Sequence, residues 1–323
     1  MKAIVYERYG TPEVLHLKDI EKPVPNENEV LIKIFATTVT AADVMMRKAA
    51  SFMGRIILGL IRPRKKFRIP GIELSGIIEG TGKNVRRFKK GDEIYGFAGF
   101  NPGTYAQYKC LPETASLAIK PANMTFEESV ALVDGATTAY FFLKQKGDVK
   151  KGERVLINGA SGSIGSFAVQ LAKLFEAEVT GVCSTKNVSL VKSLGADKVI
   201  DYTSEDFTCN GEKYDIIFDT VGKSSFKRCK KSLNKNGRYL ITTGAMIKNY
   251  ILTLCTSRSS KRYIFAMSVN KTEALNFVRE IAQKGQLKPV IDKSYSLEKI
   301  IEAHRYVEQG HKKGNVVVTV VHE

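Results

Sequence analysis

The chain has 323 residues, 43% of them hydrophobic and 26% charged, a composition typical of a globular protein with room for two domains. No stretch approaches the roughly 18 uncharged apolar residues of a membrane span, and the first residues lack the basic and apolar regions of a secretory signal. Five cysteines without a C-x-x-C pair argue against a disulfide framework, so we expect a protein of the reducing cytoplasm.

The formal net charge of +17 favours anionic partners, which include a phosphorylated cofactor, a membrane surface and nucleic acid. The densest basic segment is Arg62 to Arg68, RPRKKFR, which follows the apolar stretch FMGRIILGLI. Three interpretations are open: a solvated loop beside a short helix, a lid over an anionic ligand, or a contact with a membrane surface. We expect at most weak binding to anionic surfaces and no specific nucleic-acid partner.

The first 120 residues carry short alternating runs that predict β-strands. These runs cover 2–8, 29–39, 73–80 and 104–111, and turn sequences rich in Pro, Gly and Asn separate them. The pattern indicates an antiparallel, loop-rich β region.

From Thr125 the pattern becomes helical, because Thr125 and Glu128 form a capping box ahead of a helix predicted over 125–146. Apolar strands and helices then alternate, as in a parallel sheet covered by helices on both faces. The strands are expected at 154–158, 177–183, 198–202, 214–221 and 237–244, and the helices at 163–175, 187–196 and 224–233. Two more helices (271–285 and 296–310) and a strand (315–323) end the chain.

The stretch INGASGSIGS, residues 157–166, joins the strand at 154–158 to the helix that follows it. Ala160, Gly162 and Gly165 occupy the fixed positions of A-x-G-x-x-G. Between a strand and a helix, such a turn brings the backbone and the helix amino terminus close to a pyrophosphate. We therefore predict a dinucleotide site; the alternative is merely a tight turn.

The end of the strand at 177–183 indicates which dinucleotide the site binds. An NAD site usually ends this strand with Asp or Glu, but here Cys183 is followed by Ser184, Thr185, Lys186 and Asn187, and Tyr202 ends the next strand. Hydroxyls and a cation could bind a 2′-phosphate, so NADPH is predicted over NADH. The alternative is that Ser184 or Thr185 caps the next helix.

The glycine loop and three further stretches resemble the medium-chain dehydrogenase/reductase superfamily, in its zinc-independent NADPH quinone oxidoreductase branch. These stretches are IPGIELSGIIEGTGKNVRRFKKGDEIYG, GVCSTKNVSLVKSLGADKVIDY and EAHRYVEQGHKKGNVVVTV. The resemblance spans nearly the whole chain. It implies an α/β protein with a GroES-like β-barrel catalytic domain (1–123 and 269–323), a Rossmann doubly wound parallel sheet domain (124–268) that binds NADP, and an active site in the cleft between them.

The resemblance also implies cofactor contacts. The pyrophosphate would be held by Ser161, Gly162, Ser163 and Ile164, with Gly165 in the same turn, and the 2′-phosphate by Ser184, Lys186 and Tyr202. Val221, Gly222, Thr243 and Gly244 would line the cofactor at the carboxyl edge of the sheet. Relatives of this kind are usually homodimers joined through edge strands, here 262–269.

Zinc enzymes of the superfamily bind catalytic zinc through cysteine and histidine. The matching positions here hold Thr40, Ile72 and Asp134, and the four histidines are scattered, so we predict no metal. Without a Lewis acid, a quinone or α,β-unsaturated carbonyl is a better hydride acceptor than a simple ketone.

The catalytic residues are less well defined. The branch associates an asparagine and a tyrosine with its site, but this sequence has Thr40 and Met45 at those places and keeps Asp43. Thr40, Tyr95, Tyr140 or water could assist proton transfer; alternatively Asp43 only holds the loop, and the two tyrosines only pack in the core.

The leading hypothesis is an NADPH-dependent, zinc-independent oxidoreductase acting on quinones or α,β-unsaturated carbonyl compounds. The alternatives are an NADPH-binding protein with a basic RNA- or membrane-binding surface, and an alcohol dehydrogenase.

Overall fold

The computed structural model describes residues 1–50 and 52–322, with the backbone alone at 52 and 53. Its packing divides the chain into two units. Unit 1 comprises Met1–Asp134, Asn270–Gln283 and Pro289–Glu323, and unit 2 comprises Gly135–Val269 and Lys284–Lys288. The sequence predicts the first domain boundary after residue 123, before the first long helix. In the structure the two units instead meet within that helix, between Asp134 and Gly135.

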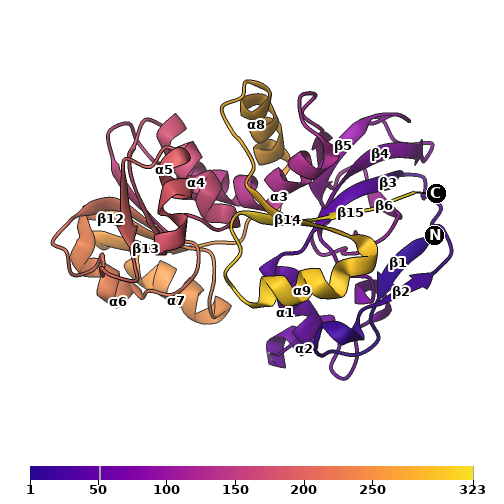
Figure 1. Cartoon of the computed structure of the whole chain (residues 1–323), viewed down its shortest axis with the longest axis horizontal. Helices are drawn as coiled ribbons and strands as arrows, with labels where there is room; N and C mark the ends of the chain where they lie inside the picture. Colours follow the sequence, from indigo (N-terminus) through magenta and orange to yellow (C-terminus); the bar gives the residue numbers. More distant parts are fainter. Residues whose placement is uncertain (51, 323) are drawn as a thin grey trace. The chain divides into compact units, whose positions relative to one another are not determined.

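Unit 1 is built around a mostly antiparallel sheet in the order β14-β15-β3-β4-β5-β7, in which only the β14–β15 pair is parallel and β6 also pairs with β3, beside a β1–β2 hairpin (Figure 1). Its strands are β1 (Lys2–Val5), β2 (His16–Asp19), β3 (Glu29–Thr38), β4 (Glu73–Thr81), β5 (Glu93–Phe97), β6 (Tyr108–Pro112), β7 (Ser116–Ile119), β14 (Ile291–Ser296) and β15 (Asn315–Thr319). Its helices are α1 (Ala41–Lys48), α2 (Phe52–Leu58), α3 (Phe126–Tyr140), α8 (Thr272–Gln283) and α9 (Ile300–Glu308), of which α3 crosses into unit 2.

Both chain ends take part in unit 1. β15 pairs antiparallel with β3, and the side chain of Gln107 bonds both the Lys2 amide and the Val321 carbonyl. The predicted strand at 104–111 is only partly correct, because regular pairing covers β6 alone, while Ala106 makes a single bridge to Ala3.

The capping box predicted at the start of α3 is confirmed. The Glu128 amide donates to the Thr125 hydroxyl at 3.1 Å, and the Thr125 amide donates to the Glu128 carboxylate at 2.9 Å. The helix continues into a wider π-type turn over Phe141–Lys146. Within the described parts of the chain, no helix is long and apolar enough to cross a membrane.

Unit 2 is a six-stranded parallel sheet in the order β10-β9-β8-β11-β12-β13, the doubly wound arrangement that the sequence predicts. Its strands are β8 (Arg154–Asn158), β9 (Glu178–Cys183), β10 (Lys198–Asp201), β11 (Tyr214–Asp219), β12 (Leu233–Ile241) and β13 (Lys261–Phe265). Its helices are α4 (Ser163–Leu174), α5 (Val188–Ser193), α6 (Phe226–Cys229) and α7 (Met246–Thr256), of which α7 was not predicted. The strand order reverses between β8 and β11, which places a ligand crevice at their carboxyl ends.

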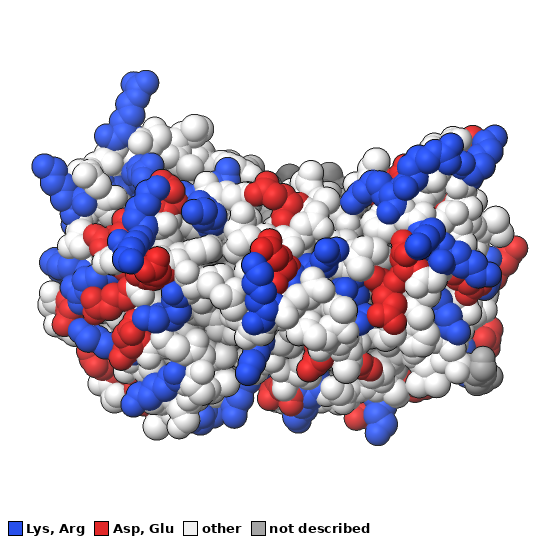
Figure 2. All heavy atoms as spheres, turned by 90° about the horizontal axis from the view of Figure 1, so that it is seen from above, with Lys and Arg blue, Asp and Glu red and all other residues white. Residues whose placement is uncertain are grey.

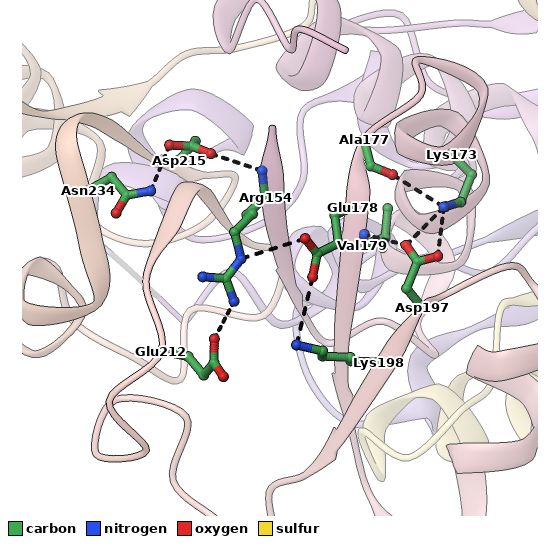
Figure 3. A network of polar contacts seen from close by, with 10 residues as sticks. All are labelled: Arg154, Lys173, Ala177, Glu178, Val179, Asp197, Lys198, Glu212, Asp215 and Asn234. Carbon is green, nitrogen blue, oxygen red and sulfur yellow. Dashed lines mark hydrogen bonds and ion pairs between the residues drawn. The ribbon is translucent and has the colours of Figure 1, made fainter. Parts of the chain in front are cut away.

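On the face drawn in Figure 2, many charged side chains are visible, and cations and carboxylates are interleaved over much of it. One such group lies at the amino ends of the strands of unit 2 (Figure 3). There the Arg154 guanidinium pairs with Glu212 and Glu178, and the Arg154 amide donates to Asp215 at 2.9 Å. Lys173 binds Asp197 at 2.8 Å. These contacts brace the sheet edge opposite the predicted cofactor site.

Candidate functional site

The glycine loop forms a close turn between β8 and α4. Gly159 has a φ of +83°, and its amide and that of Ala160 both donate to the Val182 carbonyl of β9. At Gly165 a Cβ atom would lie 2.0 Å from the Gly159 carbonyl oxygen, so only glycine lets α4 start this close to β8.

The amino terminus of α4 is open to an anion. Its N-cap is Gly162, which has no side chain to bond the first amides of the helix. Ser161, Gly162, Ser163 and Ile164 are all partly exposed around this turn. The first amides of a helix and the helix dipole favour a phosphate at such a place. The structure thus brings together the residues predicted for the pyrophosphate.

Asn187 links the glycine loop to the end of β9. Its amide nitrogen donates to the Ser161 hydroxyl at 3.0 Å and to the Ser184 hydroxyl at 3.3 Å. Its carbonyl oxygen is buried and accepts no hydrogen bond from the residues that the structure describes. A buried acceptor beside the loop needs a donor, and a cofactor hydroxyl would supply one. These residues therefore fit a dinucleotide.

The side chains predicted for the 2′-phosphate also gather here. Tyr202 follows β10, its amide donates to the Cys183 carbonyl at 3.0 Å, and both it and Lys186 are exposed. Thr185 differs from the prediction, because its hydroxyl donates to Asp201 at 2.5 Å. Asp201 also accepts the Thr203 amide, and these bonds hold the pKa of its carboxyl below the usual value.

The helix-cap alternative for this region is wrong. Ser184 lies at the start of the turn over Thr185–Asn187, but its side chain makes no capping bond. Asn187 stands at the start of α5 and likewise makes none. The polar groups after β9 are therefore engaged with the glycine loop and with Asp201.

Asp219, at the end of β11, organises the remaining carboxyl edge. Its carboxylate accepts the amides of Val221 and Gly222 at 3.1 and 2.8 Å, and the side chains of Asn158 and Tyr239 at 3.0 and 2.8 Å. The loop after β11 is thus held against β8 and β12. Sequence reasoning missed Asp219, although a carboxylate ending an apolar strand was a visible signal.

The end of β12 meets this loop. A Cβ atom at Gly222, which has a φ of +69°, would lie 2.3 Å from the Thr243 hydroxyl oxygen. The Thr243 carbonyl accepts the side-chain amide of Asn249 at 2.9 Å, and Gly244 follows with a φ of +107°. The four residues predicted to line the cofactor here are therefore neighbours.

In unit 1, Thr40 and Asp43 form a capping box at the start of α1. The Thr40 hydroxyl donates to the Asp43 carboxylate at 2.6 Å, and the Asp43 amide donates back at 3.2 Å. Burial raises the pKa of Asp43 to about 6, although the Thr40 bonds oppose the shift. The Thr40 hydroxyl proton is engaged with Asp43, so Thr40 can donate to a ligand only if this bond opens.

A buried polar group that sequence reasoning did not find lies beside this helix; we call Thr38, Glu73, Asp134 and Lys271 the Glu73 cluster. Glu73 accepts the Thr38 hydroxyl on one carboxylate oxygen and the Asp134 amide, at 2.6 Å, on the other. The Asp134 carboxylate binds the Lys271 ammonium at 2.9 Å. Burial and then the charge of Asp134 raise the pKa of Glu73 well above that of an ordinary carboxyl.

A second ammonium is close to this cluster. Burial lowers the pKa of Lys312 to about 8, while the charges of Glu73, Asp292 and Asp134 oppose that shift. The Lys312 ammonium also donates to the Gly314 carbonyl. Two ammonium groups, those of Lys271 and Lys312, thus lie near the carboxyl groups of Glu73 and Asp134.

The two tyrosine candidates lie elsewhere. Tyr95 is fully buried, and its hydroxyl donates to the Leu275 carbonyl at 2.6 Å. Its burial raises its pKa. Because its proton is engaged inside the core, the catalytic role considered for Tyr95 is not supported. Tyr140, at the end of α3, is buried in unit 2.

The predicted absence of a metal rests on the side chains at three positions. Thr40 is a helix cap, Ile72 is an apolar core residue, and Asp134 is paired with Lys271. Across residues 1–50 and 52–322, no group of three or more His, Cys, Asp or Glu side chains is placed to hold a metal ion.

Unit 2 is a doubly wound sheet with a glycine turn at its switch point, and unit 1 is a mostly antiparallel unit made from both chain ends. Together they are typical of a dehydrogenase or reductase with a dinucleotide cofactor. Comparisons with known proteins agree. Residues 26–121 match the alcohol dehydrogenase GroES-like domain, and residues 194–318 match the zinc-binding dehydrogenase family. The chain belongs to the medium-chain dehydrogenase/reductase superfamily, in its zinc-independent quinone oxidoreductase branch.

Individual relatives cover nearly the whole chain. A chloroplastic quinone oxidoreductase of Triphysaria versicolor is 33% identical over 98% of both chains. A 2-methylene-furan-3-one reductase of Solanum lycopersicum is 32% identical over 98% of this chain and 79% of its own length. The solved quinone oxidoreductase of Coxiella burnetii has a TM-score of 0.90 and 28% identity, covering 99% of each chain. The protein is therefore an oxidoreductase of the NAD(P)H-dependent type.

Proposed function

We propose that the protein is an NADPH-dependent, zinc-independent reductase of quinones or α,β-unsaturated carbonyl compounds. The observation that carries the proposal is the carboxyl edge of unit 2, where Asn187 ties an open helix terminus to the end of β9. The names of relatives, which include a quinone oxidoreductase and a 2-methylene-furan-3-one reductase, agree with this substrate class.

NADPH is favoured over NADH by the residues after β9. Lys186 is exposed and makes no ion pair with another described residue, so its ammonium is available to a 2′-phosphate. The carboxylate in this region, Asp201, belongs to β10 and is satisfied by Thr185 and Thr203. We assign the 2′-phosphate to Lys186, Ser184 and Tyr202.

When bound, the nicotinamide ring supplies a hydride to the electrophilic carbon of the conjugated acceptor. The protein then has to orient the two molecules, exclude water and provide a proton. We propose that the Glu73 cluster holds this proton. Burial and the charge of Asp134 raise the pKa of Glu73, which favours its protonated form, and the Thr38 hydroxyl bonded to it lies two residues before Thr40. Asp43 would act as a positioning residue that fixes the Thr40 turn.

A direct assay tests this proposal. The purified protein is mixed with NADPH or NADH and with a panel of quinones, 2-alkenals and simple alcohols, with and without a chelator, while nicotinamide absorbance is followed. We expect turnover with NADPH and conjugated acceptors that the chelator does not reduce. Activity toward alcohols that the chelator abolishes would support an alcohol dehydrogenase, and absence of turnover would support the binding-protein alternative.

We also propose a homodimer joined through β13. This strand ends the order of the unit 2 sheet, so one of its edges has no partner strand among the described residues. An open edge is available to pair with a second copy. Sedimentation of the purified protein should give a particle of twice the chain mass; a monomer at micromolar concentration would contradict the proposal.

A further inference from the structure

The segment that follows α1 exposes four large aliphatic side chains. Ile56, Ile57, Leu60 and Ile61 are 40%, 50%, 60% and 89% exposed, respectively. Single exposed apolar residues are common, but four within six positions form a patch that needs a partner.

The backbone holds this patch in place. α2 ends at Leu58, and Gly59 has a φ of +130°, where a Cβ atom would lie 2.1 Å from the Arg62 carbonyl oxygen. The Tyr9 hydroxyl donates to the Gly59 carbonyl at 2.7 Å. Leu58 and Phe67 are buried in one small core cluster with Ala49. The aliphatic side chains are therefore displayed from an anchored turn.

Cations lie next to them. Residues 44–72 contain eight Lys and Arg and no Asp or Glu. Arg62, Arg64, Lys65 and Lys66 are exposed, and none pairs with a carboxylate of a described residue. The Arg64 amide donates to the Leu58 carbonyl at 2.8 Å, and its guanidinium donates to the Ile56 carbonyl at 3.0 Å, so the basic turn folds back on the end of α2.

Several exposed lysines elsewhere on the described surface are paired, although α7 also exposes apolar side chains beside Lys248. Lys22, Lys83, Lys150 and Lys151 each pair with a carboxylate. Cations and carboxylates are likewise interleaved on the face drawn in Figure 2. The basic-aliphatic segment, Ile56 to Lys66, thus combines unpaired positive charge with exposed aliphatic area.

We propose that the basic-aliphatic segment docks the protein reversibly on an anionic lipid bilayer. Aliphatic side chains insert at the boundary between headgroups and acyl chains, while Lys and Arg bind lipid phosphates and carboxylates. Nucleic acid would use the cations but not four aliphatic side chains, since its bases stack on aromatic rings. The proposal does not depend on the enzymatic function.

Vesicle flotation of the full chain tests it. The vesicles contain phosphatidylcholine alone or with about 30% phosphatidylserine, in about 0.15 M salt. We expect binding to the anionic vesicles only. Because each charge near such a surface is worth about a fivefold change in affinity, K65A/K66A should weaken binding about 25-fold. L60S/I61S should also weaken it.

Matched variants control for charge and hydrophobicity elsewhere. K150A/K151A removes the same charge from an exposed turn of unit 2, and V24S/V321S removes two other exposed apolar side chains. Both should bind vesicles like the wild type, and circular dichroism should show that every variant is folded.

Three outcomes would overturn the proposal. The first is no vesicle binding at about 0.15 M salt, and the second is equal weakening in the segment variants and their matched controls. The third is unchanged vesicle binding in K65A/K66A with a raised KM for NADPH, which would make the segment a lid over an anionic ligand. Retention on poly(U) that L60S/I61S leaves intact, without vesicle binding, would instead assign the segment to RNA.

Discussion

Replacing Gly165 by alanine should disrupt the cofactor site through the backbone. The new Cβ atom would lie 2.0 Å from the Gly159 carbonyl oxygen, and its next contacts are also with backbone atoms. An acceptable carbon–oxygen contact is about 3.3 Å, so the start of α4 must retreat by about 1.3 Å. Overpacking of this kind costs about 1–3 kcal/mol of stability.

Cofactor binding should suffer as well. If the retreat removes one charge-assisted bond from an α4 amide to the pyrophosphate, the loss is about 1.5–3 kcal/mol. NADPH affinity, measured by nicotinamide fluorescence, should therefore fall about 10- to 150-fold, and urea unfolding should report the lower stability. Wild-type stability and wild-type affinity in G165A would refute the reasoning.

Gly162 provides the matched variant. Its φ is −80°, and the nearest atom to an added Cβ, the Gly159 carbonyl oxygen, is 3.4 Å away. The free energy of unfolding of G162A should therefore lie within about 0.5 kcal/mol of that of the wild type. Because the methyl group would stand where the pyrophosphate is proposed, NADPH affinity should still fall. Unchanged affinity in G162A would contradict the assignment of the phosphate to this turn.

Three further predictions concern single side chains. K186A should raise the KM for NADPH about fivefold, since an exposed ion pair is worth about 1 kcal/mol, and leave the KM for NADH unchanged; equal effects on the two cofactors would remove Lys186 from the 2′-phosphate site. T40A should cost about 0.5–2 kcal/mol in urea unfolding because α1 loses its cap, whereas T40S should retain most of the stability; a T40A chain as stable as the wild type would show that the cap is unimportant. Native Glu73 keeps its proton to a higher pH than the unfolded chain does. Between the pKa of an ordinary carboxyl and the raised pKa of Glu73, about 8, the native state therefore binds more protons, and its free energy of unfolding should fall by up to about 1.4 kcal/mol per pH unit. E73Q should lack this contribution, and parallel pH profiles for E73Q and the wild type would show that the pKa of Glu73 is not raised.

The sequence predicted the fold of unit 2 well because its strands are apolar on both faces. β8 and β11 are almost completely buried, and their unbroken apolar runs indicate a parallel sheet. Other elements lacked that signal. All four residues of β2 are exposed, and α7 leaves Ile247 and Leu254 in solvent, so neither carries the one-sided pattern on which prediction depends.

The site was predictable where its chemistry is local. The glycine loop and the residues after Cys183 each lie within one short stretch, and their order carries the information. The Glu73 cluster could not be found this way, because Glu73, Asp134 and Lys271 come from three separate segments that only folding brings together. Tyr95 was a catalytic candidate that the structure does not support, because its hydroxyl bonds the Leu275 carbonyl through packing that the sequence does not reveal.

The central claim is that hydride passes from NADPH to the conjugated carbon of an acceptor without a metal. Its most direct test is the reduction of a 2-alkenal by chelator-treated protein with NADPH deuterated at C4 of the nicotinamide, followed by mass spectrometry of the product. The account predicts a saturated aldehyde with deuterium on C3. Deuterium on C1, in an allylic alcohol, or no transfer after chelation, would contradict it.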